Sequence, residues 1–313
     1  MKKKADKVLI IKVGYSETLD AQVSNVTSYG DVLRSTVLLN LYRNDDVTWL
    51  VDEKALPVLR GNPYIKRILI YNLDSALQLQ AERFDTVINL EKVPGLCALT
   101  DSVKAWRRYG FRFDANTGDA ESYDGSHVVL ALCRNLEHKR NRKICWQEGL
   151  FEMVGAQWKD EEYVLGYKPK GKVKADIGFN YLVGNKWPLK GWPMPYWKRL
   201  KKAIGKKYKV SWQQGKEDVE AYFEWINSCR MIVTNDSFGM HIAIALKKPF
   251  VAIFGPTPYH ENFLYGRGVA CYPKDLDCEF FPCRKDICPH FKDGCTTRVK
   301  PEEVLGQIKR LLA

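Results

Sequence analysis

The sequence predicts an α/β protein with two doubly wound domains, each a parallel sheet flanked by helices. Short β-rich runs alternate with helical patterns through most of the 313 residues, as is typical of βαβ units. The alternation lapses between residues 114 and 172 and then restarts. We therefore expect two domains facing each other across a cleft, with ligands at the carboxyl ends of the strands.

The first half is expected to hold four strands with helices between them. The strands are expected at residues 7–13, 47–52, 67–72 and 85–90, and the helices at 31–44, 55–65 and 73–84. A polar loop follows at 114–127, with helical segments within 127–155. The stretch 167–176 is basic and contains Gly and Pro, which is typical of a linker. It places the boundary near residue 170, giving domains 1–170 and 171–313.

The second half repeats the pattern. Strands are expected at residues 177–184, 208–214, 230–236 and 249–257, and helices at 194–206, 217–229 and 237–248. The tail, 300–313, is an amphipathic helix with a proline at its start. This last helix could extend back and pack toward the first domain.

The composition is that of a globular protein with a strongly basic balance. Hydrophobic residues make up 45% of the chain, and its formal net charge is +12. Such a charge favours an anionic partner: nucleic acid, an acidic membrane surface or a phosphorylated small molecule. A merely basic soluble surface is the alternative.

The N-terminus predicts a cytoplasmic protein that could lie at the inner face of the inner membrane. The basic start resembles that of a signal peptide, but the apolar run before Lys12 is too short for one, and no stretch is long enough to span a membrane. The nine cysteines should then be thiols or metal ligands. Cys278, Cys283, Cys288 and Cys295 predict a structural zinc or iron site. Two disulfides, or free thiols in a Pro-rich loop, are the alternatives.

The stretch TNDSFGMH at 234–241 joins an apolar strand to an apolar helix. Asp236 and Ser237 stand at the helix start, where backbone N–H groups and the helix dipole form a ready site for phosphate. Gly239 permits close backbone approach, and His241 falls in the first turn. The alternative is a capped helix with a packed histidine.

Two further stretches are expected at strand ends. NKWPLKGWPMPYW, at 185–197, carries Lys186 and Lys190, which could neutralise a diphosphate or could be solvated beside a core tryptophan. SYGDVLRST, at 28–36, puts Gly30 and Asp31 at the start of the first helix. An aspartate there is usually a cap, but it becomes a candidate general base if it faces a substrate hydroxyl.

Several familiar signals are missing from the sequence. It contains no Walker loop, no G-x-G-x-x-G after a strand and no H-E-x-x-H. Asp275 and Asp277 resemble the acidic pair of some sugar-nucleotide enzymes but precede the cysteine loop, so we interpret them as surface charge.

Taken together, these stretches resemble glycosyltransferase family nine, the bacterial ADP-heptose:lipopolysaccharide heptosyltransferases. The resemblance lies in SYGDVLRSTVLL, GNPYIKRILIYN, KWPLKGWP and TNDSFGMHIAIALKKPFVAIFGPT, in that order along the chain. It implies a GT-B fold of two Rossmann-like domains, the N-terminal one binding the acceptor and the C-terminal one the nucleotide sugar. It also implies an inverting sugar transfer without a catalytic metal or other cofactor.

The resemblance also implies roles for individual residues. Asp31 would be the catalytic base, Lys190 would hold the donor diphosphate with help from Lys186, and Asp236 would lie at the donor sugar. Backbone amides from Ser237, Phe238, Gly239 and Met240 would meet the phosphates beside His241, and Glu217 would bind the ribose hydroxyls. The leaving diphosphate gains negative charge, which such amides and a lysine stabilise without a divalent ion.

The chain departs from the family pattern in two places. Phe238 stands where a glycine usually follows Asp-Ser, with Gly239 one place later, and residues 15–26 form an insertion expected to line the acceptor side. The implied partners are ADP-heptose and a lipopolysaccharide or other surface-glycan precursor, with the basic surface resting on the anionic inner membrane. The alternatives are another nucleotide sugar, a protein or soluble acceptor, or a nucleic-acid-binding protein that is no enzyme. We expect no nucleic-acid partner because no known binding module is visible.

Overall fold

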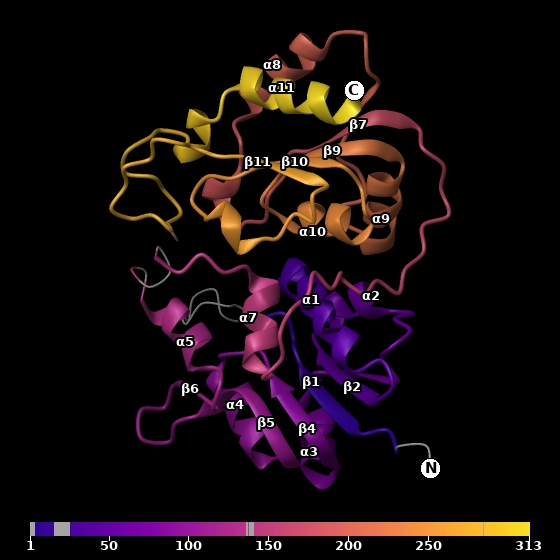
Figure 1. Ribbon diagram of the computed structural model, residues 1–313, viewed down its shortest axis with the longest axis vertical. Coiled ribbons are helices and arrows are strands. Elements are labelled where there is room, and N and C mark those ends of the chain that lie inside the picture. Colours follow the sequence, from indigo (N-terminus) through magenta and orange to yellow (C-terminus); the bar gives the residue numbers. More distant parts are fainter. Residues whose placement is uncertain (1–3, 16–25, 136, 138–140, 284) are drawn as a thin grey trace. The chain divides into compact units, whose positions relative to one another are not determined.

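The computed structural model describes residues 4–313 except 16–25, 136, 138–140 and 284 (Figure 1). Its contacts divide the chain into two units, Met1–Tyr167 and Lys168–Ala313. Each unit contains its own sheet, its own helices and its own apolar core.

The first unit is built on a six-stranded sheet with the order β3-β2-β1-β4-β5-β6. Its strands are β1 (Lys7–Ile11), β2 (Asp46–Val51), β3 (Arg67–Ile70), β4 (Arg83–Asn89), β5 (Lys104–Phe113) and β6 (Ala120–Ser122). The first five run parallel, and β6 is antiparallel to β5. The carboxyl ends of β1 and β4 are therefore adjacent, because Ile11 pairs with Asn89.

Helices surround this sheet. They are α1 (Tyr29–Ser35), η1 (Thr36–Leu41), η2 (Glu53–Ala55), α2 (Leu56–Leu59), α3 (Leu73–Ala81), α4 (Pro94–Ser102), α5 (His127–Arg134) and α7 (Trp146–Met153). Leu79 of α3 and Leu96 of α4 pack in one cluster with Leu9 and Val87 of the sheet. Helices α3 and α4 thus cover one face of the sheet and contribute to its core.

The helix predicted at 31–44 is instead a short α-helix followed by a 3-10 turn. The Ser35 hydroxyl donates to the Asp31 carbonyl (2.7 Å) and the Thr36 hydroxyl to the Leu33 carbonyl (2.6 Å). Such back-bonding by hydroxyl side chains bends and tightens helices. The loop predicted at 114–127 likewise contains the short edge strand β6.

The second unit has a five-stranded parallel sheet with the order β11-β10-β9-β7-β8. Its strands are β7 (Ala175–Asn180), β8 (Val210–Trp212), β9 (Cys229–Asn235), β10 (Phe250–Ile253) and β11 (Gly268–Cys271). Its helices are η3 (Pro188–Lys190), α8 (Met194–Ile204), α9 (Val219–Asn227), α10 (Phe238–Ala245), η4 (Tyr259–Glu261), η5 (Cys295–Arg298) and α11 (Pro301–Leu312). Helices α8 and α11 lie on one face of the sheet, and α9 and α10 lie on the other (Figure 1).

The last helix, α11, packs within the second unit. Val304 and Ile308, both buried, join the core cluster of Trp197 and Val251. Its apolar face packs beside α8 and against β10 and β11. Within the described residues, no helix is long and apolar enough to cross a lipid bilayer.

Candidate functional site

In the second unit, the strand end at Asp236 is the centre of the site. Strand β9 ends at Asn235, α10 begins at Phe238, and Asp236 lies between them with only 6% of its surface exposed. Its backbone N–H donates to the Ile253 carbonyl at the end of β10 (3.1 Å). The turn is therefore fixed to the sheet at its carboxyl edge, where α/β proteins bind ligands.

Lys190 and Thr257 reach Asp236 from two other segments. Lys190 Nζ lies 2.8 Å from Asp236 Oδ2, and the Thr257 hydroxyl donates to the same oxygen at 2.6 Å. Lys190 ends η3, and Thr257 follows β10. Three segments that are distant in sequence thus meet at one carboxylate.

The loop that carries Lys190 is held by buried polar contacts. The side chain of Asn235 accepts from the Trp192 backbone N–H (3.0 Å) and donates to the Tyr181 carbonyl (2.8 Å). The Thr296 hydroxyl donates to the Gly191 carbonyl (2.9 Å). Because these partners are buried or nearly so, the position of Lys190 is set before any ligand arrives.

Asp236 stays ionised despite its burial. Removal from water opposes its charge, but the Lys190 ammonium, the Thr257 hydroxyl and the nearby His241 more than offset this effect. The pKa of the Asp236 carboxyl therefore lies below its usual value.

At the start of α10 one first-turn amide is already bonded, because the Met240 backbone N–H donates to the Ser237 carbonyl (3.0 Å). The Ser237 hydroxyl does not cap this helix but accepts a hydrogen bond from the Asn180 side-chain amide (2.9 Å). That amide also donates to the Thr234 hydroxyl (2.7 Å), and Asn180 accepts from the Tyr222 hydroxyl. The N-terminal N–H groups of a helix and its dipole attract anions.

The arrangement explains why Phe238 and Gly239 stand in this order. A Cβ on Gly239 would lie 2.5 Å from the Tyr222 hydroxyl and closer still to the Asn180 amide, so only glycine fits there. Phe238 packs edge-on against Tyr222 and Phe223 of α9, with ring centroids 5.8 and 6.2 Å away. The departure from the family pattern is thus accommodated by packing between α9 and α10.

The other residues predicted on this side lie at the same edge but not in the carboxylate cluster. Lys186 is half-buried in the loop after β7, and Glu217 is exposed in the turn between β8 and α9. His241 is buried in the first turn of α10. Sequence reasoning missed Thr257, Asn180, Asn235 and Tyr222; only Thr257 had a signal, as the last residue of the FGPT stretch.

In the first unit, Asp31 is paired rather than free. It lies in α1, where Arg34 Nη2 is 3.1 Å from its Oδ1, and the two side chains are 13% and 8% exposed. The Arg34 guanidinium lies over the Trp146 ring of α7, 4.5 Å from its centroid. Arg34 therefore fixes the Asp31 carboxylate while leaving it partly accessible. The insertion expected on the acceptor side falls almost wholly within 16–25, outside the described residues.

The cysteine prediction is not supported. Among the described residues, no group of three or more His, Cys, Asp or Glu side chains could hold a metal ion. The four thiols are free, and burial followed by the neighbouring thiols raises the pKa of Cys295 to about 12.

Part of the chain is similar in sequence to known glycosyltransferases. Residues 214–289 match the family model described as glycosyltransferase family 9 (heptosyltransferase). The chain is 34% identical over 97 residues to lipooligosaccharide heptosyltransferase 2 of Campylobacter jejuni, covering 31% of this chain and 30% of that protein. The match therefore spans less than a third of that relative's length. The resemblance to glycosyltransferase family nine is confirmed.

Solved structures match over nearly the whole chain. A family 9 glycosyl transferase from Veillonella parvula has a TM-score of 0.68 at 18% identity, covering 100% of this chain and 98% of that one. The ADP-heptose lipopolysaccharide heptosyltransferase II of E. coli has a TM-score of 0.66 at 15% identity, covering 98% of each chain. The predicted GT-B fold with two doubly wound sheets is thereby confirmed.

Proposed function

We propose, from its match to glycosyltransferase family nine, that this chain is an inverting glycosyltransferase. It moves a sugar, heptose from ADP-heptose, onto a lipopolysaccharide or other surface-glycan precursor. The observation that carries the proposal is the cluster of Lys190, Asp236 and Thr257 at the start of α10. A fixed lysine beside a helix N-terminus suits a nucleoside diphosphate.

The reaction follows from the two carboxylates and the lysine. The Asp31 carboxylate accepts the proton of the acceptor hydroxyl as that oxygen attacks the anomeric carbon. The bond from this carbon to the diphosphate oxygen breaks on the opposite face, and the nucleoside diphosphate leaves with its electron pair. Lys190 and the first amides of α10 stabilise the charge that develops on the leaving group. Asp236 holds Lys190 in place and lies at the donor sugar.

Each of the two ion pairs orients one charged group that takes part in this reaction. Arg34 orients the Asp31 carboxylate before the acceptor binds. Asp236 orients the Lys190 ammonium, whose remaining hydrogens can donate to phosphate oxygens. Because the positive charge comes from side chains and backbone, the transfer needs no divalent cation, and we expect full activity in the presence of EDTA.

Calorimetric titration with ADP, UDP and GDP tests the donor assignment. We expect ADP to bind most tightly of the three nucleotides. Lys190→Ala should weaken the affinity for ADP at least about tenfold, because a charged partner of the diphosphate is lost. Lys202→Ala, at an exposed lysine near the end of α8, should bind ADP like the wild type. A preference for UDP or GDP would discard heptose but keep the chemistry, and a lack of binding to all three would reject the donor site.

A further inference from the structure

A buried glutamate lies at the base of the loop that joins β1 to α1. Glu91 follows β4 and is fully buried. Its Oε1 accepts from the backbone N–H groups of Gly14 (2.8 Å) and Tyr15 (3.1 Å) and lies 3.2 Å from Lys12 Nζ. Because β1 and β4 are neighbours in the sheet, the chain that leaves β1 is held by a carboxylate from the end of the next strand.

Gly14 connects this carboxylate to α1. Its carbonyl accepts from the Ser28 N–H (2.5 Å), and the Ser28 carbonyl accepts from the Val32 N–H (3.3 Å) in the first turn of the helix. Gly14 has a φ of +100°, and a Cβ there would lie only 3.0 Å from Val32 Cγ2. The start of α1 is therefore attached to Gly14, and Gly14 is attached to Glu91.

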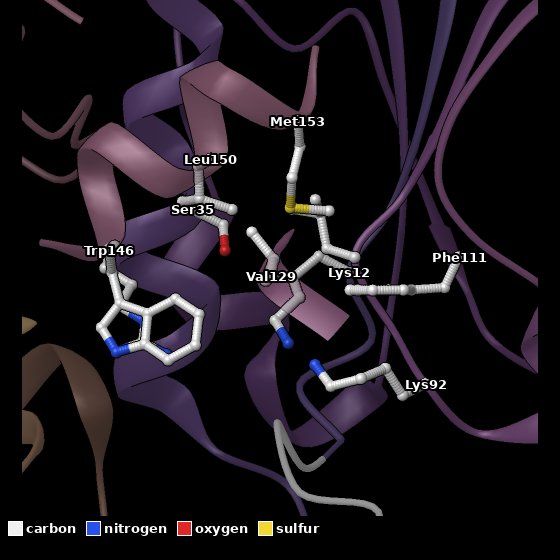
Figure 2. A pocket seen from close by; sticks show the side chains of 10 residues that line it. Lys12, Ser35, Lys92, Phe111, Val129, Trp146, Leu150 and Met153 are labelled. Atoms are coloured by element: carbon white, nitrogen blue, oxygen red, sulfur yellow. The ribbon is translucent and has the colours of Figure 1, made fainter. Parts of the chain in front are cut away.

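The helix held in this way carries Asp31 and Arg34, which form an ion pair. Arg34 lines a pocket together with Lys12 and with Trp146 of α7 (Figure 2). The basic partner of Glu91 and the basic partner of Asp31 thus belong to one group of packed side chains.

The Glu91 carboxylate is costly to bury and is only partly compensated. Its second oxygen, Oε2, has no hydrogen-bond partner among the described residues. Burial raises the pKa of the Glu91 carboxyl, and Lys12 and the Gly14 amide offset only part of this effect. Replacing a buried ion pair by apolar side chains of similar volume is often neutral or stabilising. Stability alone therefore gives little reason for a glutamate here.

We propose that Glu91 is a positioning residue for the transfer reaction, which fixes Gly14 and, through Gly14, the start of α1 with Asp31. The inference rests on the proposed function and adds to it a residue that acts through another. Its effect is geometric, because a base displaced by about 1 Å can slow a reaction about 10²-fold. The loss should appear in kcat and leave ADP affinity unchanged, because the proposed donor site lies in the second unit.

The test compares two double variants that both lack the buried charges. The first, Lys12→Met/Glu91→Gln, keeps a side-chain oxygen that can accept from Gly14 and Tyr15, whereas the second, Lys12→Met/Glu91→Met, does not. Because both carry the same change at Lys12, a difference between them reports the bonds to the loop. The control is Glu82→Met, which removes a partly exposed ion pair just before β4.

Three properties are measured on the full chain. They are ADP affinity by calorimetry, the rate of ADP release from ADP-heptose with heptose-free lipopolysaccharide as the acceptor, and the indole N–H resonance of Trp146, assigned with Trp146→Phe. This resonance reports the position of Arg34, whose guanidinium lies over the Trp146 ring. It requires no acceptor, so it tests the hold of Glu91 on α1 independently of the reaction.

We expect kcat of the second double variant to lie about 10- to 100-fold below that of the first. ADP affinity should be equal in the two, and the Trp146 resonance should differ between them. Glu82→Met should match the wild type in all three properties.

Equal kcat in the two double variants would overturn the proposal, as would identical Trp146 resonances. A lower melting temperature in the second variant with kcat unchanged would show that Glu91 is only structural. A wild type that releases no ADP would reject the proposed function alone. In that case Trp146 resonances that differ still support the hold of Glu91 on α1, and identical ones overturn it.

Discussion

At the scale of single residues, each unit contains an aspartate with a basic partner. Asp31 is oriented by Arg34 and remains partly accessible, whereas Asp236 is buried against Lys190 and Thr257. The first arrangement suits a group that must take up a proton, and the second suits a group that must stay charged. The roles proposed for these carboxylates therefore follow from their surroundings.

Replacing Asp31 tests its role as the base. In Asp31→Asn the amide cannot accept the acceptor's proton, so transfer should fall about 10²- to 10⁴-fold, while ADP affinity stays within error. Asp124→Asn, at an exposed position before α5, is the control, and both rates come from a coupled assay of ADP release. Turnover near the wild-type rate in Asp31→Asn would remove Asp31 from the mechanism.

The acid stability of the protein should depend on Lys190. Because the pKa of Asp236 is lower in the folded chain than in the unfolded one, acidification favours unfolding. This contribution is complete above about pH 5 and is lost as pH falls below about 3.9 toward the folded pKa. Lys190→Ala removes a main offset to burial and raises the pKa of Asp236 in the folded chain toward or above its unfolded value, so the loss of stability on acidification should become smaller or reverse. The free energy of unfolding between about pH 3 and pH 6 measures this, and parallel curves for the two proteins would contradict it.

At the scale of elements, the contact between α9 and α10 shapes the proposed donor site. Tyr222 of α9 bonds to Asn180, and Gly239 of α10 lies against both. Phe238 anchors the first turn of α10 on the rings of α9. Three elements thus have to keep their spacing for the first turn of α10 to stay in place.

Two glycine-to-alanine changes distinguish the steric effect of this close contact from the general gain in stability that alanine gives a helix. Gly239→Ala should lower the free energy of unfolding by about 1–3 kcal/mol, because its methyl overlaps Asn180 and Tyr222, and it should weaken ADP binding. Gly306→Ala in α11 has nothing within 4 Å of the new Cβ and should stabilise the chain by about 0.5–1 kcal/mol. Urea unfolding measures both, and a stable Gly239→Ala that binds ADP normally would refute the close contact.

The sequence allowed the fold class and the main strand ends to be predicted, because buried parallel strands are continuous apolar runs such as VLII and MIV. It did not reveal β5, whose residues KAWRRYGFRF are charged and half exposed, or the short β6. Lys190 and Asp236 were found from their motifs, yet nothing local indicated that Asn235 would tie their segments together.

At the scale of the whole molecule, the net charge of +12 should bring the protein to anionic membranes. Each basic residue near an anionic surface contributes about 1 kcal/mol, and salt screens the attraction. We expect binding to vesicles containing phosphatidylglycerol, weak binding to pure phosphatidylcholine, and release as the salt is raised from about 0.05 to 0.5 M. Co-sedimentation measures this, and equal binding to both vesicles would rule out electrostatic attachment.

The burial of α10 affects the kinetics and the selectivity with which the proposed nucleotide donor would bind. Residues 239–244 of this helix and all but one residue of β9 are buried, so the amides that would meet the phosphates cannot separate from the core by local fluctuation. Hydrogen exchange at Ile242, Ala243 and Ile244, later in the same helix, should be among the slowest in the chain, on the timescale of global opening. A receptor this rigid recognises its nucleotide by a preformed shape, and discrimination between nucleotides should then appear in their dissociation rates.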